Sequence, residues 1–274
     1  MSRYLSSIVS LLLVLFVLTT ATILDGQTNP FRDQAQAGAP AVGAVEPPAH
    51  DATAESLERS GDDLRARKLY LDACDYYKAA LVKKPDRPVI YNKLGIAELQ
   101  MRRWPEARKD FERAIKFDHE YSDAYNNLGV VYYEAKKYGK ALDKYQKAIQ
   151  IRDDAASYYN NMGAAYFAKK DFERAAIAYG HALQLDPDVF ERSSRTGVSA
   201  QLPKPEDRAR YDYVVAKLYA KMGIPERSLM YLRRAMEEGY KGIGNVYKDE
   251  EFAELRKDPR FVELMAAKPP GIPD

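Results

Sequence analysis

The chain has 274 residues, and its 42 Lys or Arg against 40 Asp or Glu leave a formal net charge of only +2. Such a balance creates no overall field that would favour nucleic acid, so we expect no nucleic-acid partner. A single cysteine, Cys74, excludes an intramolecular disulfide framework. We expect Cys74 to be a small buried residue, because nothing nearby in the sequence would lower the pKa of its thiol.

The segment 1–25 has the composition of an export signal. Arg3 supplies a positive charge, residues 8–18 (IVSLLLVLFVL) form an apolar run, and small and polar residues follow. Two outcomes stay open, cleavage of the signal or its retention as a single anchor, because residues 4–24 are uncharged and just long enough to span a bilayer. The sequence therefore predicts an exported protein of the periplasm or cell envelope, either soluble after cleavage or attached to the membrane by this segment.

Residues 26–53 differ in composition from everything that follows them. They are rich in Ala, Gly, Pro and Gln and have no helical periodicity. We expect a flexible linker, which would hold the rest of the chain away from a membrane if the anchor is retained.

From residue 54 the sequence repeats with a constant period, in four units of equal length without a gap: 54–87, 88–121, 122–155 and 156–189. Each unit predicts two amphipathic helices, with apolar and small residues at spacings of three and four along one face. The small residues indicate places where two helices approach too closely for a branched side chain. In the third unit the positions concerned are Tyr125, Leu128, Gly129, Tyr132, Ala141, Tyr145 and Ala148.

The order of these residues is a large side chain, Leu–Gly and Tyr in the first helix, then Ala, an aromatic residue and Ala in the second, with a late Pro. A helix-turn-helix unit of this length and signature resembles the tetratricopeptide repeat family. The first unit is the weakest of the four, because Ser60 replaces the large apolar residue of its first helix. The resemblance implies an all-α fold, a right-handed superhelical solenoid of helical hairpins.

After residue 189 the register breaks, because Pro203 and Pro205 exclude a continuous helix. We expect a passive connector there, with a flap over the groove as the alternative. The pattern returns in a degenerate fifth unit that departs from it at Asp212 and Tyr240, and the tail has short apolar patterns around Pro259 that are typical of a helical cap. These segments are the connector 190–208, the fifth unit 209–242, and the C-terminal helical cap and tail 243–274.

In the tetratricopeptide repeat family the first helix of each unit lines an inner, concave groove, so the resemblance implies which residues face it. Asparagines recur at two of these positions beside an apolar stripe, and an asparagine amide can both donate to and accept from the backbone of a bound peptide. The alternative is that the asparagines only bridge neighbouring repeats. The first unit has charged groove positions instead, which predicts a polar end cap. The predicted groove residues are Asn92, Lys93, Ile96, Asn126, Asn127, Val130, Tyr133, Asn160, Asn161 and Phe167.

No motif in the sequence predicts catalysis. The three histidines, His50, His119 and His181, have no Cys, Asp or Glu at ligand spacing, and the two glycines of YKGIGNVY lack the rest of a phosphate-binding loop. We therefore expect no enzyme activity, no metal and no cofactor. The preferred hypothesis is a non-catalytic scaffold that binds a peptide or protein segment in the concave groove, outside the cytoplasm. The alternative is a component of cell-envelope assembly that oligomerises through its outer face or end to end.

Overall fold

The computed structural model describes residues 45–191 and 205–267, and within these ranges it contains helices and turns but no strand. The predicted export signal and most of the predicted linker and connector lie outside the described residues. The helices of the described residues belong to one compact unit that begins at Pro47.

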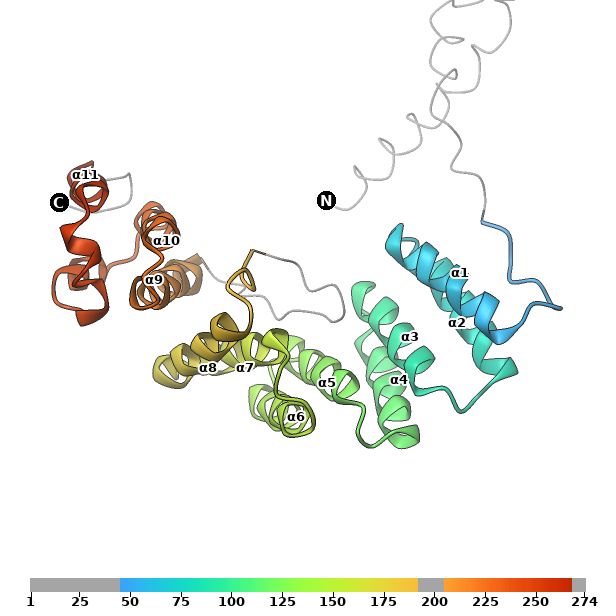
Figure 1. Ribbon diagram of the computed structural model, residues 1–274. Helices are drawn as coiled ribbons and strands as arrows, with labels where there is room; N and C mark the ends of the chain where they lie inside the picture. The colour runs from blue at the N-terminus through green and yellow to red at the C-terminus, as the bar shows by residue number, and fades with distance from the viewer. Residues whose placement is uncertain (1–44, 192–204, 268–274) are drawn as a thin grey trace, which may run out of the picture. The chain divides into compact units, whose positions relative to one another are not determined.

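Four helical hairpins follow one another along the chain (Figure 1). Each consists of a first helix of 13 residues and a second of 14. Their bounds are α1 (Ala54–Ala66) with α2 (Tyr70–Lys83), α3 (Pro88–Gln100) with α4 (Trp104–Phe117), α5 (Ser122–Glu134) with α6 (Tyr138–Ile151), and α7 (Ala156–Ala168) with α8 (Phe172–Leu185). The predicted all-α class and the succession of hairpins are confirmed.

Every hairpin turns in the same way. The second residue after each first helix has a left-handed backbone, with φ between +58° and +63° at Lys68, Arg102, Lys136 and Lys170. The amide of the next residue then reaches back to the last turn of the helix, as in the bond from Leu69 N to Leu64 O at 2.9 Å. This is the Schellman ending, which satisfies carbonyls that the helix leaves free and reverses the direction of the chain in a short turn.

The glycines of the first helices lie against the aromatic rings of the second helices. A Cβ added to Gly61, Gly95, Gly129 or Gly163 would stand 2.5 to 2.7 Å from the ring of Tyr77, Phe111, Tyr145 or Tyr179, respectively. Carbon atoms do not approach one another so closely, so only glycine fits while the ring keeps its place. The close contacts that the small residues predicted are therefore present in all four hairpins.

Replacing Gly129 by Ala is expected to lower the free energy of unfolding by about 1 to 3 kcal/mol, because the added methyl group must displace the buried ring of Tyr145. Gly139→Ala is the matched control, since that position in α6 has no neighbouring heavy atom within 4 Å. The control should leave stability unchanged or raise it by up to about 1 kcal/mol, the difference in helix propensity. Equal effects of the two substitutions in a urea titration would contradict the packing argument.

Two of these aromatic residues carry a buried hydroxyl without a partner. Within the described part of the chain, the hydroxyls of Tyr145 and Tyr179 make no hydrogen bond, and burial raises the pKa of both well above its ordinary value. In the first hairpin, by contrast, the Tyr77 hydroxyl donates to Asp62 at 2.8 Å and accepts from Arg65 at 3.2 Å. The second hairpin has Phe111 at the same place.

We expect Tyr145→Phe to stabilise the protein by roughly 1 to 2 kcal/mol. The substitution removes a buried hydroxyl that loses its hydrogen bonds to water on folding and forms none within the protein. Tyr77→Phe should do the opposite and destabilise by about 1 kcal/mol, since Asp62 and Arg65 lose a partner. Thermal or urea unfolding of the two variants provides the comparison. A loss of stability in both would show that the Tyr145 hydroxyl is satisfied in solution.

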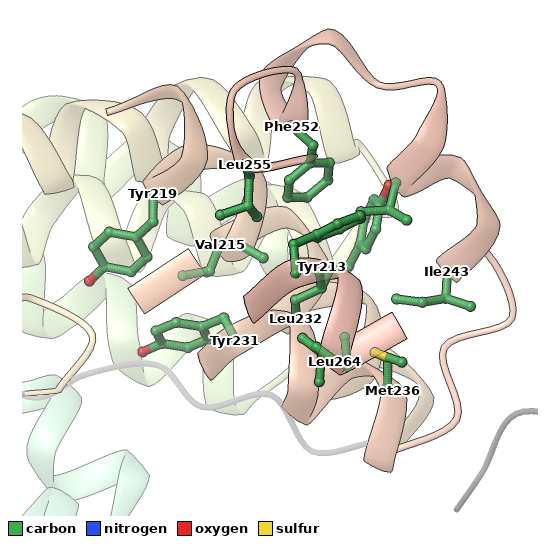
Figure 2. Packing of buried hydrophobic residues seen from close by; sticks show 14 of the residues in the cluster. Tyr213, Val215, Tyr219, Tyr231, Leu232, Met236, Ile243, Phe252, Leu255 and Leu264 are labelled. Atoms are coloured by element: carbon green, nitrogen blue, oxygen red, sulfur yellow. The ribbon is translucent and has the colours of Figure 1, made fainter. Parts of the chain in front are cut away.

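A fifth hairpin and a cap complete the described chain. The elements are α9 (Pro205–Lys221), α10 (Pro225–Glu237), the 3-10 helices η1 (Ile243–Tyr247), η2 (Glu250–Phe252) and η3 (Leu255–Lys257), and α11 (Pro259–Ala266). Their side chains share one core, in which Tyr213, Leu232 and Phe252 come from α9, α10 and the cap (Figure 2). The fifth hairpin and the cap are thus packed as a single body.

The fifth hairpin keeps the register that the sequence predicts from residue 209. Gly223 has φ +71° at the place where the first four hairpins have Lys or Arg, and Val215, Tyr219 and Leu232 are fully buried at the pattern's contact positions. The helix itself begins earlier than expected, at Pro205, inside the segment 190–208 that we predicted as a connector. The sequence argument failed there because proline is well tolerated in the first turn of a helix.

Candidate functional site

The asparagines predicted to face a groove form a row of hydrogen bonds between the first helices. Asn161 Nδ2 donates to Asn126 Oδ1 at 2.9 Å, and Asn127 Nδ2 donates to Asn92 Oδ1 at 3.0 Å. Asn126 Nδ2 donates to Asn127 Oδ1 at 3.2 Å, which joins the two bridges, and Asn92 Nδ2 donates to the Tyr121 hydroxyl at 3.2 Å. We call the four asparagines, Asn92, Asn126, Asn127 and Asn161, the asparagine row. It links α3, α5 and α7.

The row is buried, and so is the apolar stripe beside it. Asn127 and Asn161 are 0% exposed, and Val130 and Phe167 are each 1% exposed. Our expectation of side chains open to a peptide therefore needs correction: these amides are buried and bond one another, so a bound peptide cannot reach them. Of the predicted groove residues, only Lys93 and Asn160 are partly exposed. The others are buried: Asn92, Ile96, Asn126, Asn127, Val130, Tyr133, Asn161 and Phe167.

Lys93 is held by the first hairpin. Its Nζ donates to Glu58 Oε1 and to Asp62 Oδ2, both at 2.6 Å. Arg87 also lies 3.5 Å from Glu58 Oε2. The charged groove positions of the first hairpin thus bind Lys93 of α3 and Arg87 in the turn before α3, which is a structural role for residues that we predicted as a polar end cap.

The row ends at the fifth hairpin. Each bridge runs from the sixth position of one unit to the fifth position of the unit before it, so the next bridge would run from residue 214 to Asn160. Residue 214 is Val, which has no donor. Within the described residues the Asn160 side chain makes no hydrogen bond, and the regular packing of first helix on first helix stops here.

A cleft lies at this break in the stack. It is bounded by α8, α9 and the cap segments η1 and η2, and has a volume of about 750 Å³. Ile177 of α8 and Met222, which directly follows α9, are 57% and 39% exposed and belong to its lining, together with the partly buried Val214 and Leu218. Large apolar side chains in an open cleft are typical of a surface that binds another molecule.

Charged groups line the same cleft. Lys217 Nζ lies 3.1 Å from Asp249 Oδ2 and 3.2 Å from Glu251 Oε2, so α9 is tied to the cap at this point. The Arg210 guanidinium lies 4.3 Å from the ring centroid of Phe172. Within the described ranges neither Arg210 nor Lys221 has a carboxylate partner. The cleft therefore combines apolar side chains with two cations that are free to bind an anionic group.

Our sequence reasoning did not find the cleft, although one signal for it was available. In the first three hairpins the second helix has a charged residue at the position of Ile177, namely Asp75, Lys109 or Asp143. At the position of Gly180, the first three hairpins have Lys78, Glu112 and Gln146. At these two positions α8 therefore lacks the polar residues that α2, α4 and α6 have.

No other feature of the described residues resembles a chemical site. Over residues 45–191 and 205–267, no three side chains among His, Cys, Asp and Glu are grouped so that they could hold a metal ion. Cys74 is fully buried, and burial raises the pKa of its thiol to about 12, which keeps it protonated and unreactive. Among the helices of these residues, none is long and apolar enough to cross a bilayer.

Comparisons with known proteins agree with the fold of repeated helical hairpins. A family model described as tetratricopeptide repeat matches residues 86–154 and 120–188. The solved structure of PilF from Pseudomonas aeruginosa is similar over 78% of this chain and 97% of its own, with a TM-score of 0.53 and 16% identity. At that identity the likeness shows the fold alone.

Two further structures share less of the geometry. MamA from Desulfovibrio magneticus RS-1 is 18% identical with a TM-score of 0.48, covering 68% of this chain and 94% of its own. YrrB, described as a TPR protein with an unusual peptide-binding site, is 18% identical with a TM-score of 0.45, covering 74% and 91%. No curated protein matches the chain by sequence. The matched family model and the repeated hairpins together show that residues 86–188 consist of tetratricopeptide repeats.

Proposed function

We propose that the chain is a non-catalytic interaction scaffold that binds a peptide or protein segment in the cleft between α8, α9 and the cap. Tetratricopeptide repeats serve other proteins as extended binding surfaces. The observation that carries the proposal is the exposure of Ile177 and Met222 in a cleft of about 750 Å³. A peptide can bury both side chains and place an acidic group near Arg210 or Lys221, whereas the asparagine row is buried and out of its reach.

Selection of random peptides on the full chain, from a displayed library, would test the proposal. Enriched peptides should bind the Ile177→Asp variant at least about tenfold more weakly, because a charge replaces the apolar contact at the centre of the cleft. Val82→Asp is the matched control: Val82 is also an exposed apolar residue of a second helix, but it lies outside the cleft. Circular dichroism should show the same helix content in all three proteins.

The result also decides between the cleft and the groove positions that remain accessible. Peptides that ignore Ile177→Asp but lose affinity in Asn160→Ala would move the site to the first helices. A library from which no peptide is enriched would contradict peptide binding altogether.

We further propose that the repeats act outside the cytoplasm, in the periplasm or cell envelope. The support is the sequence alone: Arg3, the apolar run 8–18 and the small and polar residues after it, all outside the described part of the structure. A reporter enzyme that works only in an oxidising compartment, fused after residue 274, should be active in cells. The same fusion without residues 1–25 should be inactive, and activity of both or of neither would contradict export.

A further inference from the structure

The turns within the hairpins all emerge at one edge of the repeat stack. The asparagine bridges join the same level of successive first helices, the sixth position of one to the fifth of the previous one. Successive first helices therefore run parallel, and their C-terminal ends lie side by side. The turns from first to second helix share one edge, and the turns from one hairpin to the next share the opposite edge.

The edge with the turns inside the hairpins is basic. Each of the four turns has two adjacent cations, and all eight are exposed. Arg67 pairs with Asp63 and Arg103 with Glu98, each at 3.5 Å. For the other six, no ion pair with a carboxylate is present among the described residues. We call this set the basic edge; it consists of Arg67, Lys68, Arg102, Arg103, Lys136, Lys137, Lys169 and Lys170.

Local structure explains only part of the basic edge. A cation at the end of a helix interacts favourably with the helix dipole, which accounts for one Lys or Arg at each turn. It does not account for the second cation, nor for Lys or Arg in a left-handed conformation that costs about 1 kcal/mol and that glycine adopts freely. The fifth hairpin has Gly223 at this place. Four strained cations at the same position of four successive repeats indicate a function of the edge itself.

The opposite edge is acidic. Exposed carboxylates follow the second helices of the first three hairpins. The cations at these turns are bound to carboxylates of this chain: Lys84 and Arg87 contact Glu55, and Arg152 contacts Asp123 at 2.7 Å and, more loosely, Asp154 at 3.8 Å. We call the carboxylates the acidic edge; they are Asp86, Asp118, Glu120, Asp153 and Asp154.

We propose that the basic edge binds the acidic edge of a second copy of this chain. Each hairpin contributes residues to both edges, so the charges on the two edges recur with the same spacing, one hairpin. The basic edge of one copy can therefore pair with the acidic edge of another over several repeats. Since the two edges are different surfaces, the contact is head-to-tail and leaves one free edge of each kind at the ends of the assembly. The proposal does not depend on peptide binding in the cleft.

Charge reversal at either edge would test it in the full chain, held in a neutral detergent. The basic-edge variant combines Arg102→Glu, Lys136→Glu and Lys170→Glu, and the acidic-edge variant combines Asp86→Lys, Glu120→Lys and Asp153→Lys. A control with the same change of net charge as the basic-edge variant reverses three exposed cations elsewhere: Lys109→Glu, Lys147→Glu and Arg233→Glu. Association is measured between donor-labelled and acceptor-labelled copies, with circular dichroism as the check on folding.

We expect the unmodified chain to associate at an ionic strength of about 0.02 M and to lose at least about tenfold in affinity at about 0.5 M, where surface charges are screened. Each edge variant alone should not associate, the control should associate normally, and a mixture of the two edge variants should associate again. Absence of association in the unmodified chain would overturn the proposal. So would association that survives both salt and charge reversal, which would point to an apolar contact, and so would a mixture of folded variants that fails to associate.

Discussion

Replacing Asn127 by Ala is expected to lower the free energy of unfolding by roughly 2 to 5 kcal/mol. Asn127 is 0% exposed and has two partners, the Asn92 oxygen to which it donates and the Asn126 amide from which it accepts. Alanine leaves both partners buried without a bond, and each such group costs about 1 to 3 kcal/mol. The loss should weaken the contact between α3 and α5, where the bridge lies.

Asn160→Ala is the control for this experiment. Asn160 has the same position in its repeat as Asn92 and Asn126 have in theirs. Unlike them, it is partly exposed and has no hydrogen-bond partner among the described residues. Its replacement should change stability by no more than about 0.5 kcal/mol. Urea titration of the two variants measures the difference. If Asn127→Ala costs no more than Asn160→Ala, the asparagine row contributes little to the stacking of the repeats.

The sequence predicted the repeat fold well, for a physical reason. A constant period of this length fixes two helices and a turn, and the alternation of small and large residues fixes which faces meet. Gly129 and Tyr145 illustrate this, since the contact between them follows from their positions in the pattern and recurs in every unit. The register of the fifth hairpin could be predicted in the same way, down to the buried Ser228 at the second-helix position where the other hairpins have Ala.

The predicted groove failed for a different reason. Periodicity tells which side of a helix a residue is on, but not whether the neighbouring helix covers that side. Asparagine is equally suited to a bound peptide and to another asparagine, so Asn126 and Asn127 could not be assigned from their chemistry alone. The structure resolves the ambiguity through short distances between repeats.

The cleft could not be predicted from periodicity, because it arises where the periodicity is interrupted. Its walls come from α8 and α9, which the register break separates, and from a cap that has no repeat pattern. The local signals were Ile177 and Gly180 at positions where the first three hairpins have polar or charged residues. In this chain, the cleft that we propose as the binding site is therefore signalled by departures from the repeat and not by the repeat itself.

Asp212 is the other departure with a measurable consequence. It occupies a contact position of the fifth hairpin at which the earlier hairpins have Leu57, Tyr91, Tyr125 and Tyr159. Asp212 is only 8% exposed, and its burial, helped by the charge of Glu238, raises the pKa of its carboxyl group to about 7. Arg234 and Arg208 act in the opposite direction and lower this pKa, but by less than burial raises it. A carboxyl group with this pKa is uncharged in mild acid and becomes charged near neutral pH.

The consequence for stability has a definite sign. An unfolded Asp has a pKa of about 3.9, so between about pH 4 and pH 7 the folded protein binds the proton that the unfolded chain releases. The contribution of Asp212 to the free energy of unfolding therefore falls as the pH rises through that window, and above pH 7 the buried charge destabilises the fold. Asp212→Asn should raise stability at pH 8 by roughly 2 to 4 kcal/mol and leave it almost unchanged at pH 4. Urea titrations at both pH values measure this, with Asp153→Asn at an exposed position as the control. A gain of the same size at both pH values would show that Asp212 is charged throughout, held so by Arg234 and Arg208.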